Sequence, residues 1–146
     1  MNSTSLTFEI FDDPLQPALN AVDAGLGRHN DESAPLGDVR PLAAFARRQT
    51  GEVMGGAVGR TWGACCELQQ LWVDPAHRGQ GIASRLLIEF EGRATSRGCR
   101  VFYLTTFSFQ APDFYRKHGY SVSAETSGFP DGIVKYFMHK EAATAR

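Results

Sequence analysis

The segment His77-Arg78-Gly79-Gln80-Gly81-Ile82-Ala83-Ser84 follows an apolar stretch, Leu68 to Val73, and leads into a long amphipathic stretch. The apolar stretch predicts a strand and the amphipathic one predicts a helix. A glycine-rich turn that opens a helix presents unpaired backbone N–H groups beside the positive end of the helix dipole. Because glycine has no Cβ, a phosphate could approach the backbone closely at Gly79 and Gly81. The sequence therefore predicts a site for a phosphorylated compound at this turn.

Two better-known phosphate-binding motifs do not fit the turn. A Walker A loop requires Lys followed by Ser or Thr after its last glycine, and that pair is missing after Gly81. A dinucleotide-binding fingerprint requires a third glycine, and Arg85 occupies that position. The turn must therefore serve another class of phosphorylated ligand.

The hydrophobic pattern of the whole chain predicts an α/β fold, an α+β arrangement around a mixed sheet. Predicted strands cover residues 6–11, 42–48, 52–60, 64–73, 101–104, 120–124 and 133–139, and predicted helices cover about 14–26, 80–97 and 111–119, with a loop over 28–38. Leu68 and Leu71 would fall on opposite faces of a regular strand, so we expect a β-bulge between Glu67 and Leu71. The glycines inside the third predicted strand, Gly55, Gly56 and Gly59, indicate close approach of another backbone or of a ligand.

Composition and charge narrow the class of protein. The chain has 146 residues, enough for a single domain over residues 1–146, and 42% of them are hydrophobic and 21% charged, as in globular proteins. A formal net charge of -1 argues against broad electrostatic capture of nucleic acid or of an anionic membrane. The first residues lack the basic and apolar regions of a secretion signal. Cys65, Cys66 and Cys99 have no spacing suited to a metal site or to disulfides, so we expect reduced cysteines in a cytoplasmic protein.

The glycine-rich turn and its flanks resemble a known family. The pattern Arg78-x-x-Gly81-x-Ala83, preceded by Leu71-Trp72-Val73, resembles the acetyl-CoA pyrophosphate loop of the GNAT acetyltransferase superfamily. The predicted order of strands and helices is also that of the GNAT fold. The resemblance implies an acyl-CoA N-acyltransferase fold, with a central mixed sheet of six to seven strands flanked by helices and one splayed strand pair. It implies acetyl-CoA as co-substrate, no metal, and cofactor contacts from Leu71, Trp72, Val73, Arg78, Gly79, Gln80, Gly81, Ile82, Ala83 and Ser84.

A second block, from Ser108 to Tyr120, resembles the later motif of the same superfamily. There the tyrosine that matches Tyr115 lies near the thioester sulfur and can protonate the leaving thiolate. A phenol suits that task, because its pKa of ~10 is comparable with the ~8.5 of a cysteine-type thiol; the alternative is an aromatic residue that only packs in the core. Many members have Asn where this chain has Ser108, a predicted contact of the pantetheine arm. Because serine is shorter, that contact would be lost or supplied through water.

The resemblance also suggests how the acceptor amine loses its proton. Glu67 occupies a position similar to that of the base in some histone-type members, and partial burial would raise the pKa of such a carboxyl. An ordered water is the alternative base. We expect the pantetheine arm to lie between the strand that ends at Val73 and the strand that ends at Leu104, with a free backbone N–H near Val73 polarising the thioester carbonyl.

The function implied is N-acetyl transfer from acetyl-CoA to a primary amine, by direct attack, with a small molecule as acceptor and no nucleic acid or membrane partner. Two alternatives stay open: acetylation of proteins or peptides, and a non-catalytic acyl-CoA-binding module. Dimers are common in the superfamily, but the sequence shows no direct sign of a homodimer interface. Acceptor specificity is the least readable feature; the candidate aromatic residues, which could equally pack in the core, are Trp62, Phe107, Phe109, Phe129 and Tyr136.

Overall fold

The computed structural model describes residues 5–142, and the chain separates into two compact units, residues 1–36 and 37–146. In the first unit, residues 5–15 have no regular secondary structure and helix α1 spans Gln16–Ser33. The strand predicted over residues 6–11 is therefore wrong: a strand needs a partner for its backbone groups, and this unit otherwise holds one helix. The predicted loop over 28–38 is wrong in its first half, because Gly25 and Gly27 disfavour a helix by only ~1 kcal/mol each and α1 continues through them.

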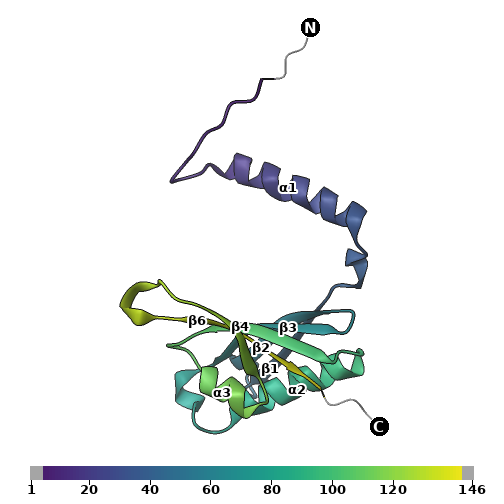
Figure 1. Cartoon of the computed structure of the whole chain (residues 1–146). Helices are drawn as coiled ribbons and strands as arrows, with labels where there is room; N and C mark the ends of the chain where they lie inside the picture. Colours follow the sequence, from purple (N-terminus) through teal and green to yellow (C-terminus); the bar gives the residue numbers. More distant parts are fainter. Residues whose placement is uncertain (1–4, 143–146) are drawn as a thin grey trace. The chain divides into compact units, whose positions relative to one another are not determined.

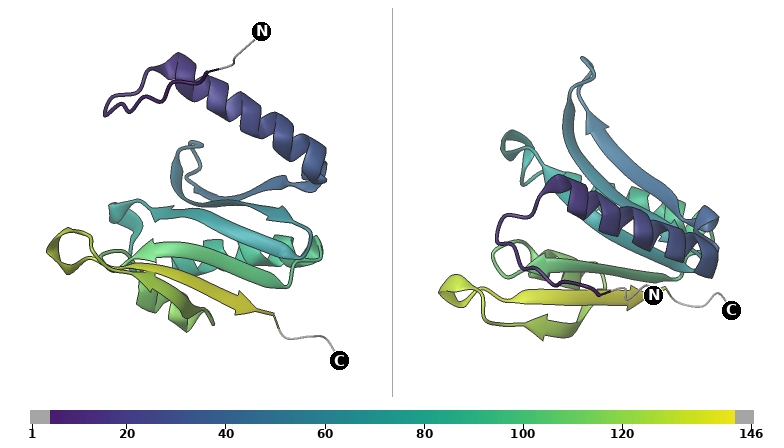
Figure 2. Two further views of the ribbon diagram at one scale, coloured as in Figure 1. Left: turned by 45° about the horizontal axis from the view of Figure 1, so that its top comes forward. Right: turned by 90° about the horizontal axis from the view of Figure 1, so that it is seen from above.

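The second unit is built on a six-stranded sheet (Figures 1 and 2). Its strands are β1 (Arg40–Arg47), β2 (Val53–Trp62), β3 (Cys65–Val73), β4 (Val101–Phe107), β5 (Ser121–Thr126) and β6 (Lys135–Glu141), in the spatial order β1-β2-β3-β4-β6-β5. The helices are α2 (Ile82–Ser96) and α3 (Pro112–Lys117), with 3₁₀ turns η1 (Leu36–Asp38), η2 (Pro75–His77) and η3 (Pro130–Gly132). Helices α2 and α3 lie on the same face of the sheet (Figure 1). The prediction of a mixed α/β sheet flanked by helices is confirmed.

Strands β3 and β4 are the parallel pair of this sheet, and they diverge early. They pair through Cys65, Cys66 and Glu67, whose partners are Val101, Phe102 and Tyr103, and the pairing ends there. On the other side of β3 the register with β2 shifts, because Val58 pairs with Gln70 while Gly59 pairs with Leu68. Gln69 is thus the extra residue of a β-bulge, as the sequence predicted. The splayed strand pair is confirmed.

Glycine permits the close contact between β2 and the bulged strand. A Cβ placed on Gly59 would overlap the carbonyl oxygen of Glu67 and lie 2.9 Å from Cζ of Phe90. One placed on Gly55 would lie 3.0 Å from the carbonyl oxygen of Trp72. The predicted close approach of another backbone is confirmed at these two positions, and it lets the bulge form directly above α2.

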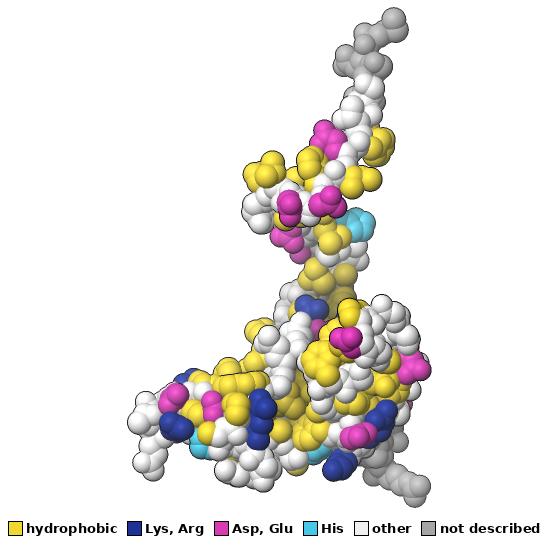
Figure 3. All heavy atoms as spheres, turned by 90° about the vertical axis from the view of Figure 1, so that its left-hand side faces the viewer, with side chains coloured by type: hydrophobic (Ala, Val, Ile, Leu, Met, Phe, Trp, Pro, Cys, Tyr) yellow, Lys and Arg dark blue, Asp and Glu magenta, His cyan; other side chains and the backbone are white. Residues whose placement is uncertain are grey.

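Helix α2 supplies the apolar layer under the sheet. Leu86, Leu87, Phe90 and Ala94 are buried on one face of the helix. They belong to one core with buried residues of β4 and β6, among them Leu104 and Met138. Figure 3 shows hydrophobic side chains gathered across the middle of one face of this unit, with charged side chains scattered around them. Burial thus fixes α2, and with it the turn that precedes the helix.

The cysteines of the described chain are free, with Cys66 and Cys99 buried and Cys65 exposed. Burial raises the pKa of the Cys66 thiol to about 12, so it stays protonated and unreactive near neutral pH. Among residues 5–142, no three His, Cys, Asp or Glu side chains gather as metal ligands would. No helix in this part of the chain combines the length and the apolar character that crossing a bilayer requires.

Candidate active site

The glycine-rich turn has the backbone geometry that the sequence predicted for a phosphate site. Gly79 and Gly81 have φ of 79° and 78°, in the left-handed region that favours glycine, and Gly81 is the N-cap of α2. A Cβ placed on either glycine would have no neighbouring atom within 4 Å, so the protein leaves this space open. A cavity of about 250 Å³ lies at the turn, lined by predicted cofactor residues from Val73 to Ser84 and by Phe114. We call this cavity the cradle.

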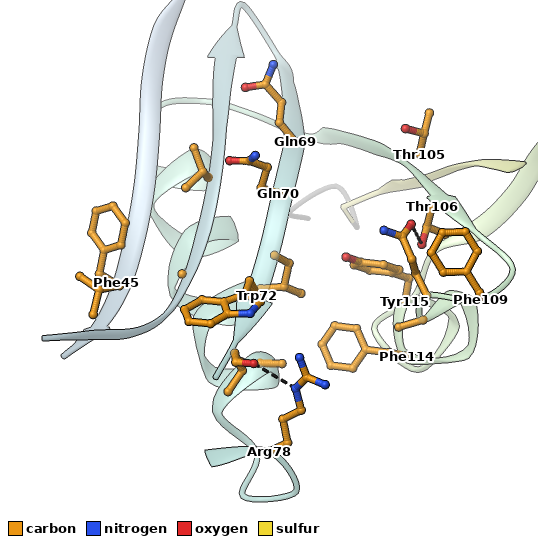
Figure 4. Close-up of a pocket in the computed structure, with 18 residues that line it drawn as sticks. Phe45, Gln69, Gln70, Trp72, Arg78, Thr105, Thr106, Phe109, Phe114 and Tyr115 are labelled. Carbon is orange, nitrogen blue, oxygen red and sulfur yellow. Dashed lines mark hydrogen bonds between the residues drawn. The ribbon is translucent and has the colours of Figure 1, made fainter. Parts of the chain in front are cut away.

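A hydrogen bond fixes the Arg78 side chain at the end of β3, where β3 and β4 diverge. Its Nε donates a hydrogen bond to the carbonyl oxygen of Val73 at 3.0 Å, drawn as a dashed line in Figure 4. The preceding turn is fixed by Asp74, whose carboxylate accepts a hydrogen bond from the Ala76 N–H at 2.9 Å. The guanidinium therefore brings positive charge between the cradle and the end of β3, where anions would be attracted.

A larger cavity of about 810 Å³ opens where β3 and β4 diverge (Figure 4). The predicted residues Leu71, Trp72 and Val73 line one wall. Thr105 and Thr106 of β4 and Phe114 and Tyr115 of α3 line the other side. This main cavity shares Val73, Arg78, Ala83 and Phe114 with the cradle, so the two adjoin. Of the predicted cofactor residues, Gln80 and Ser108 line neither cavity.

Tyr115 is buried, with 8% of its surface exposed, yet it lines the main cavity. Its hydroxyl points into the space between the diverging strands (Figure 4). Burial raises the pKa of Tyr115 to about 12, because the phenolate would lose its hydration. The phenol therefore keeps its proton throughout the physiological range and faces the cavity as a donor.

Two polar residues of the cavity wall were missed by the sequence reasoning. The side-chain carbonyl oxygen of Gln110 accepts hydrogen bonds from the Phe107 N–H at 2.7 Å and from the Thr106 hydroxyl at 3.3 Å. Both Gln110 and Thr106 line the main cavity. Their pairing closes the end of β4 onto the turn before α3. Because Gln110 follows its partners by only three and four residues, the contact is a local one that the sequence reasoning missed.

The aromatic wall differs from the predicted set. Of the five candidates only Phe109 lines the main cavity, joined by Phe45, Trp72 and Phe114. Phe107 instead stacks on Phe109, with ring centroids 5.4 Å apart, and meets Phe129 edge-on at 5.4 Å. Trp72 and Phe109 are 48% and 67% exposed, so large aromatic surfaces face the open space.

Glu67 lies beside the main cavity rather than in its wall. Its carboxylate pairs with Nε of Arg60 at 3.3 Å. It lines a side cavity of about 190 Å³ that shares Gln69 and Thr105 with the main cavity. The pKa of the neighbouring Tyr103 is raised by burial and by the charge of Glu67. Any proton transfer from the main cavity to Glu67 would therefore pass through the side cavity.

Ser108 is engaged in the fold of the last hairpin. Its hydroxyl accepts a hydrogen bond from the Val134 N–H at 3.0 Å, and its own N–H donates to the Val134 carbonyl at 2.8 Å. The structure therefore places Ser108 at the base of the loop before β6, and its contact with the cofactor stays a prediction.

Comparisons with known proteins agree with this geometry. The chain matches the Acetyltransferase (GNAT) family over residues 7–120. It is 35% identical over 133 residues to a blasticidin-S acetyltransferase from Streptomyces morookaense, covering 88% of this chain and 91% of that protein. A crystal structure of an acetyltransferase from Bacillus cereus superposes with a TM-score of 0.75 at 28% identity, over 91% of this chain and 97% of that one. A Bacillus anthracis protein solved in complex with acetyl coenzyme A shares the fold at a TM-score of 0.60 and 17% identity, over 69% and 62% of the two chains.

Proposed function

Because the chain belongs to the GNAT acetyltransferase family, we propose that it acetylates a primary amine of a small molecule, with acetyl-CoA as donor. The observation that carries this proposal is the row of two adjoining cavities that leads from the Gly81 turn, past the end of β3, to Tyr115. Its open end at the left-handed glycines fits a diphosphate, since no protein atom fills that space. Its middle, between Val73 and Thr106, fits the extended arm of the cofactor.

When bound, acetyl-CoA would supply the acetyl group as a thioester, and the protein would supply positioning and proton transfer. Gly79, Gly81, Ser84 and Arg78 would hold the diphosphate, and Leu71 to Val73 would line the arm. Tyr115 would hold the proton that the departing thiolate takes up. With a pKa of about 12, Tyr115 is a weaker acid than the phenol assumed from the sequence, so it would hold a hydrogen bond to the sulfur and give up its proton only as the carbon–sulfur bond breaks.

The amine must also lose a proton, and Glu67 or an ordered water would take it. The side cavity supports a combination of the two: at about 190 Å³ it has room for several waters, given roughly 30 Å³ each in the liquid. These waters would connect Glu67 to the main cavity past Thr105. The pairing with Nε of Arg60 at 3.3 Å holds the Glu67 carboxylate at the side cavity.

The walls of the main cavity favour a small acceptor over a peptide. Phe45, Trp72 and Phe109 offer exposed aromatic surface, while Gln69 and Gln70 offer neutral hydrogen-bonding groups. Such walls suit a compact molecule held by stacking and by a few polar contacts. The similarity to a protein named for acetylation of blasticidin S supports the same class of acceptor.

The proposal is tested by incubating the full chain with acetyl-CoA and a panel of amines, following release of free thiol and confirming the products by mass spectrometry. The panel includes blasticidin S, amino acids, polyamines and lysine-containing peptides. Acetylation of one or more small amines is the expected result. Acetylation of peptides alone would establish the alternative of a protein N-acetyltransferase, and coenzyme A binding without turnover would establish a binding module.

Two further expectations stay predictions. The free cysteines suit a reducing, cytoplasmic environment. A homodimer is common in the family, and sedimentation of the purified chain would reveal it.

A further inference from the structure

His118 contacts α2 and β6, which lie far from it in the sequence, as well as Phe114 and Tyr115 of the adjacent α3. Its Nε2 lies 3.0 Å from the hydroxyl oxygen of Ser84, in the first turn of α2. Its backbone N–H donates to the Tyr115 carbonyl at 3.0 Å, and its carbonyl accepts from Nζ of Lys140 at 2.8 Å. Its ring also packs against Phe114, with centroids 4.7 Å apart. No local sequence motif distinguishes this histidine from the others.

Among the residues that contact His118, Ser84 is the one that a bound diphosphate would contact, because it lines the cradle. A hydroxyl group has one hydrogen to donate and two lone pairs. If Nε2 of His118 is bare, it accepts the hydrogen of Ser84, and only lone pairs face the cradle. If Nε2 carries a proton, it donates to Ser84, and the hydroxyl hydrogen is free for a phosphate oxygen.

We propose that His118 is a positioning residue for the cofactor diphosphate, acting through Ser84, and that its protonated form strengthens binding. The inference rests on the proposed function, since it takes the cradle to be the diphosphate site. A doubly protonated imidazole always has a proton on Nε2, and its positive charge adds to the attraction. The same histidine contacts Phe114 through its ring and Tyr115 through its backbone N–H. One residue therefore contacts both the diphosphate site and the helix turn that carries the tyrosine.

Other titratable and charged groups surround His118 and Ser84, and their effect on the pH dependence of binding must be distinguished from that of His118. They are His77 and Arg78 at the cradle, Glu91 of α2, Lys140 of β6, Tyr115 and Tyr120 around the end of α3, and the exposed Asp113, Arg116 and Lys117 of α3 itself. Lys140 pairs with Glu91 at 2.8 Å, so their charges offset each other. Of the remaining groups, His77 is the other histidine at the cradle. A variant of His77 is therefore needed as a comparison.

The experiment is calorimetric titration of coenzyme A into the full chain at pH 6 and at pH 8. Histidine ordinarily titrates near pH 6.5, and a bound diphosphate favours the charged imidazole, so affinity should rise as the pH falls. Between pH 8 and pH 6, the affinity of the wild type for coenzyme A should rise about three- to tenfold more than that of His118→Gln. In this variant the amide side chain maintains the contact with Ser84 but does not titrate. Ser84→Ala should lose the same pH response, and the double variant should lose no more than either single one.

His139→Gln is the matched control, and His77→Gln measures what the second histidine near the diphosphate contributes. His77 lines the cradle, and its Nε2 lies 3.3 Å from a guanidinium nitrogen of Arg48, whereas His139 pairs with Tyr103 and Ser121 in the sheet, away from both cavities. His139→Gln should keep the full wild-type response to pH, and His77→Gln should keep the part of it that disappears in His118→Gln. An identical response in wild type and His118→Gln would overturn the inference, as would the same response with phosphate-free pantetheine. Failure of the wild type to bind coenzyme A at either pH would overturn the proposed function as well.

Discussion

At the scale of single residues, Tyr115 combines a buried ring with a hydroxyl that reaches the main cavity. Three features hold the ring: the edge-on contact with Phe114 at 5.2 Å, the edge-on contact with Tyr120 at 5.8 Å, and burial in the core. Tyr120 in turn donates to Glu91 at 2.7 Å, which anchors it to α2. The phenol thus has a fixed position, as a group that protonates a leaving atom requires.

Replacement of Tyr115 by Phe should lower kcat by about 10²- to 10⁴-fold, the usual contribution of a proton donor in the transition state. Affinity for coenzyme A should change less than about twofold, because the ring and its packing remain. Steady-state kinetics with the best acceptor and calorimetry with coenzyme A make the comparison. A variant that turns over as fast as the wild type would show that Tyr115 only packs.

The sequence predicted some of the residues that line the two cavities but not others. Tyr115 and the glycines at 79 and 81 could be predicted because they stand in short motifs whose spacing reflects one turn or one helix. His118 could not, because its role depends on Ser84, which the fold brings to it; Gln110 lies only four residues after Thr106, and its contact was missed for want of a recognised motif. Ser108 illustrates the converse, since a motif position turned out to be bonded to the loop before β6.

At the scale of elements, the left-handed turn before α2 is the feature that admits the diphosphate. Gly81→Ala should weaken coenzyme A binding more than tenfold, because its Cβ would occupy the open space beside the backbone N–H groups. Calorimetry measures the affinity. The matched control is Gly63→Ala, in the turn between β2 and β3, which also has positive φ (56°) and an open Cβ position. Both variants should unfold more easily by about 1–2 kcal/mol, and equal coenzyme A affinities would contradict the assignment of the cradle.

The bulge at Gln69 is the second decisive element, and it depends on Gly59. Gly59→Ala should lower the free energy of unfolding by about 2–3 kcal/mol, because the new methyl group overlaps the Glu67 carbonyl and crowds Phe90. Urea denaturation measures the change. Gly92→Ala is the control: Gly92 lies exposed within α2 with no atom near its Cβ position, so this variant should gain about 0.5–1 kcal/mol. Equal stabilities of the two variants would show that β2 can move away from the bulge.

The helices and strands differ in how well the sequence predicts them. The bulge could be predicted because Leu68 and Leu71 break the two-residue period of a strand, a conflict that only an extra residue resolves. The start of α3 was also correct, but the helix ends at Lys117, because Gly119 has a φ of 92° and leaves the helical region. The short strand over 6–11 failed because an apolar alternation shows what a strand could bury, without showing that a partner is present.

At the scale of the whole molecule, the buried tyrosines make the free energy of unfolding depend on pH in the alkaline range. Burial raises the pKa of Tyr115 to about 12, and burial together with the charge of Glu91 raises that of Tyr120, whereas tyrosine in an unfolded chain titrates near ~10. Their stabilising contribution is therefore complete below pH 10 and is lost as the pH rises through the folded-state values. Above pH 10 the free energy of unfolding should fall by about 1.4 kcal/mol per pH unit for each phenol.

Urea unfolding of wild type and Tyr115→Phe between pH 9.5 and 11.5 tests this linkage. The variant lacks one of the phenols, so its stability should fall less steeply with pH than that of the wild type. Parallel slopes would mean that Tyr115 ionises as easily in the folded protein as in the unfolded chain, and that its ring is not shielded from water.

The whole account depends on where the donor binds, and an amide NMR titration with coenzyme A measures that location. The account predicts that the largest shifts fall on the N–H groups of residues 79–84, followed by those of residues 71–73 and of Tyr115, while the β5 residues 121–126 stay unchanged. Shifts that gather on the β5 side of the sheet, or that leave the turn before α2 unaffected, would contradict it.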